Sequence, residues 1–291
     1  MTDSVPIVVG VDGSPSADEA VRWAAVTADR RRAPLHIVAA AFVQGRSGVP
    51  IGLPPGYLED QESERRGHLS RATTIATETA SSGSLTVSTE LVAGAPSHVL
   101  VEQSSSAQMV VLGARGRGEF TGGLVGSVST AVAAHADCPV AVIREQSAEV
   151  PGGTVVVGAD GTANSEPAVE EAFIEASLRG SGLVAVHAWS DFSLSALTAH
   201  DHPFHWRSVK EREEAALAES LAGFAEDYPE VTVRHVVVKD HPVDALVSFA
   251  ADAQLVVVGN RGRGGLSRTF LGSTSRALVH KTNCPTLIVR N

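Results

Sequence analysis

The chain has 291 residues, of which 43% are hydrophobic, 19% charged and 4% aromatic, and its formal net charge is -10. This composition is typical of a folded globular protein and excludes general disorder, and the negative charge argues against nucleic acid as a partner, because phosphate backbones bind clustered Lys and Arg. No stretch approaches about 18 consecutive apolar residues and the N-terminus lacks a basic segment, so we expect a cytoplasmic protein without a membrane span.

The sequence repeats itself at about half its length. Residues 109–128 contain a short apolar run, then glycines and arginines, then Gly126-Ser127, and residues 254–274 repeat this pattern 146 residues later. A repeat of this length predicts two domains, each large enough to bury a core. We expect a first domain at 1–146, a polar linker at 147–153 that ends in Pro151-Gly152-Gly153, and a second domain at 154–291.

In the first half, short apolar runs alternate with helical patterns. We expect strands at 6–12, 35–42, 85–92, 109–112 and 139–144, and helices at 17–32, 58–79, 97–105 and 128–135. Ser16 followed by Glu19 fits a capping box at the start of the first helix. Residues 43–58 contain several Gly and Pro and predict an irregular excursion, that is, a long loop without helix or strand. A loop of this length usually covers another part of the molecule.

The second half repeats this order. We expect strands at 155–158, 183–189, 231–238, 255–258 and 285–289, and helices at 165–179, 206–225, from Pro242 and at 273–280, with a second excursion at 190–205.

The alternation of strand and helix predicts an α/β fold of two doubly wound domains, each with a five-stranded parallel-type sheet and helices on both faces. Such sheets bind ligands beyond the carboxyl ends of their strands, at the switch point of the strand order. Asp12 and Gly113 would meet there if the first and fourth strands of the first half are neighbours.

The spacing after each fourth strand predicts a phosphate-binding loop. Gly113, two residues, Gly116, nine residues and Gly126-Ser127 recur as Gly259, Gly262 and Gly272-Ser273. Glycines let a loop bring backbone N–H groups against an anion, and a helix start adds further N–H donors and the favourable end of the dipole. This suits a di- or triphosphate, to which Arg115, Arg117, Arg261 and Arg263 can add charge-assisted contacts or from which they can point into solvent.

Asp12 and Asp160 each follow a first strand and have two interpretations. They can form the Asp-Gly turn, or they can face the sugar or base of a ligand, with a divalent cation such as Mg²⁺ between carboxylate and phosphates. Their place at the carboxyl end of a strand favours the second interpretation. A P-loop is excluded, because neither half contains Gly-Lys-Ser/Thr, and no Gly-x-Gly-x-x-Gly dinucleotide motif follows a first strand.

The pattern Gly-x-x-Gly-x9-Gly-Ser after strand four, together with Asp after strand one, resembles the ATP-binding branch of the universal stress protein family. Both halves keep the full spacing, so the chain resembles the tandem members of that family found in mycobacteria. The resemblance implies a Rossmann-like fold, tight ATP binding with at most slow hydrolysis, dimer formation through the last strand, and a role in stress or dormancy.

Together, the pattern and the resemblance give a set of nucleotide-binding candidates in each half. In the first half these are Gly10, Asp12, Ala40, Leu112, Gly113, Ala114, Arg115, Gly116, Arg117, Gly118, Glu119, Gly126, Ser127, Val128 and Ser129. In the second half they are Gly158, Asp160, Ala188, Asp191, Val258, Gly259, Asn260, Arg261, Gly262, Arg263, Gly272, Ser273, Thr274 and Ser275.

The two halves depart from each other beside the second strand. The second half has His187-Ala188, as the family often does, where the first has Ala39-Ala40, and Asp191 has no acidic counterpart in the first half. We therefore expect the two sites to differ in affinity.

Three functions remain open at this stage. An ATP-binding regulatory protein is favoured, because no Ser/His/Asp arrangement or metal cage is recognisable. Its conformation would depend on the nucleotide and would be recognised by an unknown partner protein. The chain itself would form a homodimer or pair its own two domains. The alternatives are a slow ATPase or nucleotidyl-transferring enzyme and a scaffold with vestigial sites. Cys138 and Cys284 are expected to be buried small hydrophobes rather than a disulfide.

Overall fold

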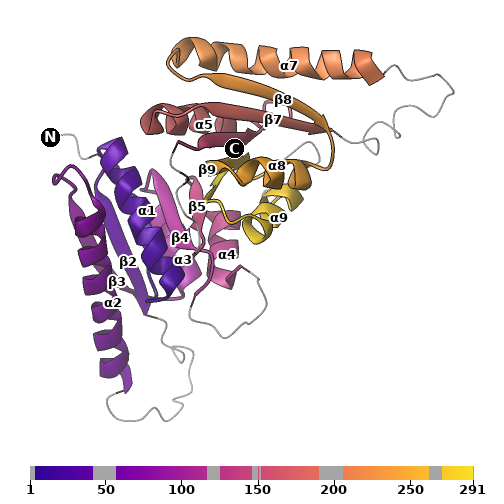
Figure 1. Ribbon diagram of the computed structural model, residues 1–291. Helices are drawn as coiled ribbons and strands as arrows, with labels where there is room; N and C mark the ends of the chain where they lie inside the picture. The colour runs from indigo at the N-terminus through magenta and orange to yellow at the C-terminus, as the bar shows by residue number, and fades with distance from the viewer. Residues whose placement is uncertain are drawn as a thin grey trace. The chain divides into compact units, whose positions relative to one another are not determined.

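The computed structural model describes residues 4–41, 57–116, 125–145, 150, 152–189, 206–261 and 271–290. The chain divides into two compact units, Met1–Ser147 and Ala148–Asn291, each of which is described by itself (Figure 1). Within the described residues, no helix is long and apolar enough to cross a membrane.

The first unit alternates strands and helices along the chain. Its elements are β1 (Ile7–Gly10), α1 (Pro15–Arg31), β2 (Leu35–Ala41), α2 (Tyr57–Thr79), β3 (Val87–Ala93), α3 (Pro96–Ser104), β4 (Met109–Gly113), α4 (Ser127–His135) and β5 (Val140–Ile143). The strand order is β3-β2-β1-β4-β5 and these neighbours pair in parallel.

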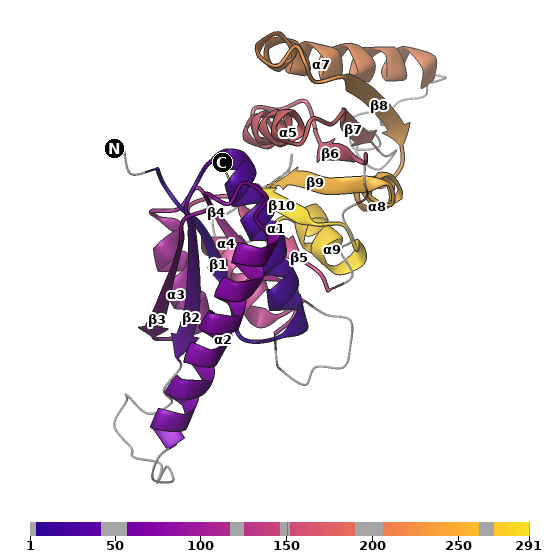
Figure 2. The same ribbon diagram turned by 60° about the vertical axis from the view of Figure 1, so that its left-hand side comes forward.

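The strand order places the helices in two layers. The chain moves outward from β1 to β2 and β3 and then returns past β1 to β4 and β5. Because parallel crossovers are right-handed, this reversal sends α1 and α2 to one face of the sheet and α3 and α4 to the other. α1 packs against α2 and α3 against α4 (Figure 2). The fold predicted from the alternation of elements is confirmed.

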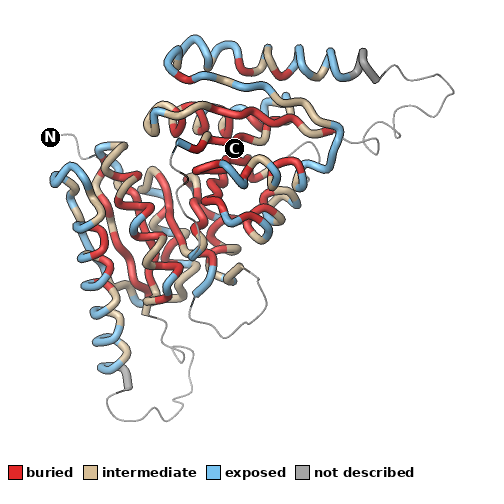
Figure 3. Tube along the Cα trace, in the orientation of Figure 1, coloured by how far each residue is buried: buried red, intermediate tan, exposed pale blue. Residues whose placement is uncertain are grey.

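The core of the first unit lies along β1, β4 and β5. All described residues of β1 and β5 are buried, as are the first four residues of β4, and Figure 3 shows these strands in red between half-exposed helices. A strand covered on both faces is apolar at every position, which explains why these runs do not alternate with polar residues. β3 lies at an end of the strand order and is largely exposed.

The second unit repeats the architecture. Its elements are β6 (Thr154–Gly158), α5 (Glu166–Arg179), β7 (Leu183–Trp189), α7 (Trp206–Asp227), β8 (Val233–Lys239), α8 (Pro242–Ala250), β9 (Ala253–Gly259), α9 (Ser273–Lys281) and β10 (Thr286–Val289). The strand order is β8-β7-β6-β9-β10, again parallel throughout. α5 packs with α7 and α8 with α9.

The start of α1 differs from the sequence-based expectation. Ser14, rather than Ser16, is the N-cap, and its Oγ accepts a hydrogen bond from the N–H of Ala17 at 3.2 Å. Pro15 is the first helical residue, because its missing N–H and fixed φ suit that position, so Ser16 already lies inside the helix. Glu19 pairs with Arg22 at 2.7 Å instead of closing a capping box. The capping-box prediction was wrong by two residues.

Candidate functional site

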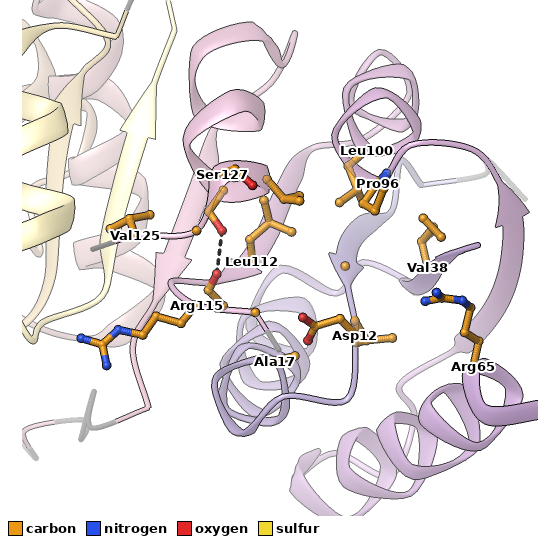
Figure 4. Close-up of a pocket in the computed structure, with 18 residues that line it drawn as sticks. Asp12, Ala17, Val38, Arg65, Pro96, Leu100, Leu112, Arg115, Val125 and Ser127 are labelled. Carbon is orange, nitrogen blue, oxygen red and sulfur yellow. Dashed lines mark hydrogen bonds between the residues drawn. The ribbon is translucent and has the colours of Figure 1, made fainter. Parts of the chain in front are cut away.

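The site lies where the strand order of the first unit reverses. β1 pairs with β4 so that Gly10 lies beside Leu112, and the segments that follow the two strands leave in different directions. A crevice forms at such a switch point because the connections diverge to opposite faces of the sheet. A cavity of about 620 Å³ occupies this position, and residues from β1, β2, α1, α2, α3, β4 and the start of α4 line it (Figure 4).

One wall of the cavity is made of backbone. Gly113 and Gly116 line it after β4, and Gly126 to Ser129 line it where α4 begins. The N–H of Gly126 donates to the carbonyl of Ala114 at 2.7 Å, and Ser129 Oγ donates to the carbonyl of Gly113 at 2.7 Å. These bonds hold the first turn of α4 against the end of β4, so the free N–H groups of that turn lie beside the cavity.

Gly113 is required by a close approach of α1. A Cβ at this position would lie 2.6 Å from Ser16 Oγ and 2.8 Å from the Ser16 carbonyl oxygen. The Ser16 hydroxyl also donates to the carbonyl of Arg115, which Ser14 Oγ contacts at 3.2 Å. The start of α1 therefore fixes the loop that follows β4. The sequence pattern does not reveal this role of Ser16, because a serine near a helix start is most simply interpreted as a cap.

Asp12 takes part in the turn and also lines the cavity. Its Oδ1 accepts a hydrogen bond from the N–H of Ser14 at 3.0 Å. A Cβ on Gly116 would lie 2.6 Å from Asp12 Oδ2, so this carboxylate lies directly against the loop after β4. Asp12 therefore forms the turn and also lies beside the loop after β4, at Gly116 rather than at Gly113.

The opposite side of the cavity is apolar. Val38 and Ala40 of β2, Pro96 and Leu100 of α3, and Leu112 of β4 line it. A Cβ at Gly10 would lie 2.7 Å from Leu112 Cδ2 and 2.9 Å from Leu100 Cδ1, so these side chains close over the end of β1 because position 10 is a glycine. An apolar wall opposite polar groups is typical of a site for a ring joined to a polar tail.

Positive charge gathers beside the backbone wall. Arg115 is exposed and lines the cavity. Burial and the neighbouring positive charge of Arg115 lower the pKa of Arg144, which follows β5. Arg115 is thus a cation beside the backbone wall, where it can pair with a bound anion.

The second unit repeats the backbone wall. The N–H of Gly272 donates to the carbonyl of Asn260 at 2.9 Å, and Ser275 Oγ donates to the carbonyl of Gly259 at 2.6 Å. Asp160 Oδ1 accepts from the N–H of Thr162 at 3.0 Å and from its hydroxyl at 2.6 Å. The carboxylate after β6 thus forms the same kind of turn as Asp12, with an additional side-chain bond.

The side wall of the second unit is different. His187 of β7 is 2% exposed, and its Nδ1 lies 2.9 Å from the carbonyl oxygen of Ala159 while its Nε2 lies 2.8 Å from Glu213 Oε2 of α7. Ala39 occupies the equivalent place in the first unit, as the fifth residue of a seven-residue strand. The sequence difference between Ala39-Ala40 and His187-Ala188 therefore has a structural meaning. His187 joins β7 to α7 through Glu213, whereas β2 has the small Ala39 at this position.

Several candidates cannot be placed. Arg117, Gly118, Glu119, Asp191, Gly262 and Arg263 lie outside the described residues. Conversely, the cavity of the first unit includes residues that the pattern did not single out, namely Val11, Ala17, Val38, Arg65, Pro96, Leu100 and Val125. Pro96 and Leu100 were detectable only as part of a helix whose position depends on the strand order.

The described fold and site define a class of protein: a tandem of two doubly wound α/β domains with a glycine-rich loop after the fourth strand of each. A sequence profile of the universal stress protein family matches residues 5–144 and again residues 153–290. Universal stress protein Rv2005c of Mycobacterium tuberculosis is 43% identical over 288 residues, which cover 98% of this chain and 96% of that protein. Universal stress protein Rv2623 of the same organism is 40% identical over 292 residues, 99% and 97% of the two chains.

A solved structure agrees with the fold. The crystal structure of a universal stress protein from Archaeoglobus fulgidus superposes with a TM-score of 0.71 at 16% identity and covers 99% of this chain and 97% of that one. The chain belongs to the universal stress protein family, as a member with two tandem domains. The resemblance to tandem members of this family is confirmed.

Proposed function

We propose that the chain is an ATP-binding regulatory protein of the stress response, with one nucleotide site in each domain. The observation that carries the proposal is the cavity of the first unit. It combines a backbone wall with the first turn of α4, a carboxylate at Asp12 and an apolar wall around Val38 and Leu100. A nucleotide has the matching parts in the same order, since its phosphates need N–H donors, its ribose an acceptor and its base an apolar slot.

The candidates fall into these roles by position. Gly113, Gly116 and Gly126 to Ser129 would hold the phosphates, Asp12 would accept from the ribose, and Ala40 would flank the base. The repeated bonds around Gly259, Gly272 and Ser275 support a second site in the other domain. The finer assignments, including Leu112, Val258 and Asp160, follow from the equivalence of the two halves.

The test is to denature the purified chain and to chromatograph what it releases. Two molar equivalents of ATP would support two working sites, and one would support a single site of high affinity. None, together with no heat of binding on titration with ATP, would contradict the proposal and favour a scaffold whose sites are vestigial.

A slow ATPase or nucleotidyl-transferring enzyme is the second candidate, because Asp12 Oδ2 lies against the phosphate-type loop where a carboxylate can share Mg²⁺ with phosphates. The two functions separate on turnover. ADP production that requires Mg²⁺ and stops in Asp12→Asn would favour the enzyme, whereas retained ATP without turnover would favour the regulator.

The remaining parts of the proposal concern the oligomeric state, the partners and the cellular location of the protein. We propose a cytoplasmic protein that forms a homodimer or pairs its own domains, binds no nucleic acid and presents its nucleotide-bound state to a partner protein. Light scattering with and without ATP tests the dimer. Limited proteolysis tests the proposed linker 147–153, since cleavage there should release the two domains 1–146 and 154–291 intact.

A further inference from the structure

Arg65 is a cation at the apolar side of the first cavity. It belongs to α2, and it lines the cavity together with Val38 and Ala40 of β2. Figure 4 shows its guanidinium group on the side of Val38, away from Ser127 and Arg115. Asp12 lies between these two sides in the same view. Arg65 is therefore placed apart from the backbone wall that suits phosphates.

The guanidinium of Arg65 is incompletely satisfied. Its Nη2 donates to Gln61 Oε1 at 3.2 Å, one helical turn earlier. Its Nε is buried and has no hydrogen-bond partner among the described residues. A buried donor without a partner costs free energy, so a shift of the side chain that brings this N–H to an acceptor on a ligand would be favourable.

The second unit has the opposite charge at this position. Arg65 and Glu213 each lie four residues before a buried leucine, Leu69 of α2 and Leu217 of α7, so they occupy equivalent places on equivalent helices. Glu213 is bound to His187 at 2.8 Å, and His187 also contacts the Ala159 carbonyl at 2.9 Å. In the second unit, Glu213 thus makes a contact within the protein, with His187. In the first unit the strand has the small Ala39, and the helix has Arg65, which lines the cavity.

A guanidinium group is planar, carries five N–H donors and accepts no hydrogen bonds. It can bond the ring nitrogens and carbonyl oxygens of a heterocyclic base, and it can stack on the face of the ring. The neighbouring Val38, Ala40 and Leu100 supply the apolar contacts that such a ring needs.

We propose that Arg65 contacts the base of the nucleotide held in the first domain and makes that site discriminate between nucleotides and simple polyphosphates, a contact that the second domain lacks. This inference rests on the proposed function, that the cavity binds a nucleotide. It assigns the first domain a base-reading residue and makes the second domain the less selective site.

The experiment compares Arg65→Ala with the unaltered chain by isothermal titration, using ATP, GTP and inorganic tripolyphosphate as ligands. Arg65→Ala is expected to weaken one ATP-binding step and one GTP-binding step by about tenfold or more, the usual range for a lost charge-assisted bond. Its affinity for tripolyphosphate is expected to stay within about twofold, since Arg65 lies away from the phosphate wall.

Arg66→Ala is the matched control. Arg66 lies on the same helix, its side chain is 67% exposed, and it pairs with Glu62 at 2.6 Å, so the control removes the same charge from a place outside the cavity. Arg66→Ala is expected to leave all three affinities unchanged. Arg65→Lys, which keeps the charge and loses the planar fork, is expected to recover only part of the ATP affinity and serves as the second variant if the alanine chain folds poorly.

Three results would overturn the inference while leaving the proposed function in place: equal affinity of Arg65→Ala and the unaltered chain for ATP, equal loss for ATP and tripolyphosphate, or weakening of both sites at once. If the unaltered chain binds no nucleotide, the proposed function itself fails.

Discussion

The two units share the backbone wall at the helix start and differ in the wall beside it. Ser129 and Ser275 bond the carbonyls of Gly113 and Gly259 at 2.7 and 2.6 Å, so the geometry at the helix start is the same in both. Beside β2 and β7 the first unit has a cavity lined by Arg65, whereas the second has the buried His187 bound to Glu213. The wall at the helix start is therefore repeated in the two units, and the wall beside the second strand has diverged.

The largest expected effect comes from the close approach at Gly113. Gly113→Ala places a methyl group 2.8 Å from the Ser16 carbonyl oxygen, whereas the equivalent Gly259→Ala meets the Arg261 carbonyl oxygen at 3.2 Å. Overpacking against backbone costs about 1–3 kcal/mol, so we expect Gly113→Ala at the upper end of this range and Gly259→Ala at the lower end. Urea unfolding measures both, and equal losses would contradict this difference between the units.

Removing the buried histidine is expected to have the next largest effect. His187→Ala deletes two hydrogen bonds of a side chain that is 2% exposed, and it leaves Glu213 and the Ala159 carbonyl without that partner. We expect a loss of about 2–3 kcal/mol in the free energy of unfolding. His36→Ala in the first unit is the control, because His36 contacts Ser88 and Glu90 on a more exposed surface. A smaller loss for His187→Ala than for this control would show that the pair does not hold the second unit together.

Substitutions in the backbone wall are expected to have smaller effects on the free energy of unfolding, and equal effects in the two units. Ser129→Ala and Ser275→Ala each remove one bond to a glycine carbonyl, at nearly the same distance and with both serines buried. Each is expected to lower the free energy of unfolding by about 1 kcal/mol. Thermal unfolding of the two variants measures this, and losses that differ by more than about twofold would break the equivalence of the walls.

The smallest effect concerns Cys138 and Cys284, which are buried thiols, as expected from the sequence. Burial raises the pKa of Cys284 to about 12, and the thiolate is the form that reacts. Iodoacetamide at pH 8 should therefore leave native Cys284 unmodified. Labelling should rise as the pH approaches 12. Unfolding of the unit at high pH would also increase labelling. Mass spectrometry with circular dichroism at each pH separates the two causes, and rapid labelling of the folded chain at pH 8 would contradict the burial.

Much of this fold could be predicted because the inner strands are covered on both faces and so appear as unbroken apolar runs, as at Met109 to Leu112. The starts of α4 and α9 could be predicted because Gly126-Ser127 recurs as Gly272-Ser273. Arg65 could not, since α2 has many charged residues and only the packing shows which of them reaches the cavity. The same holds for His187 and Glu213, which are 26 residues apart and meet only after β7 and α7 pack.

The exposed strand β3 has a consequence for solubility. It pairs with β2 on one side within the first unit, and its exposed residues include Ser88, Thr89 and Glu90 rather than the valines of β1 and β4. A strand at the end of the strand order with a charged, polar surface is a poor template for pairing with another chain. The surface of β3 therefore disfavours aggregation. Replacing this surface with valines would be expected to favour precipitation of the protein before it alters any bound ligand.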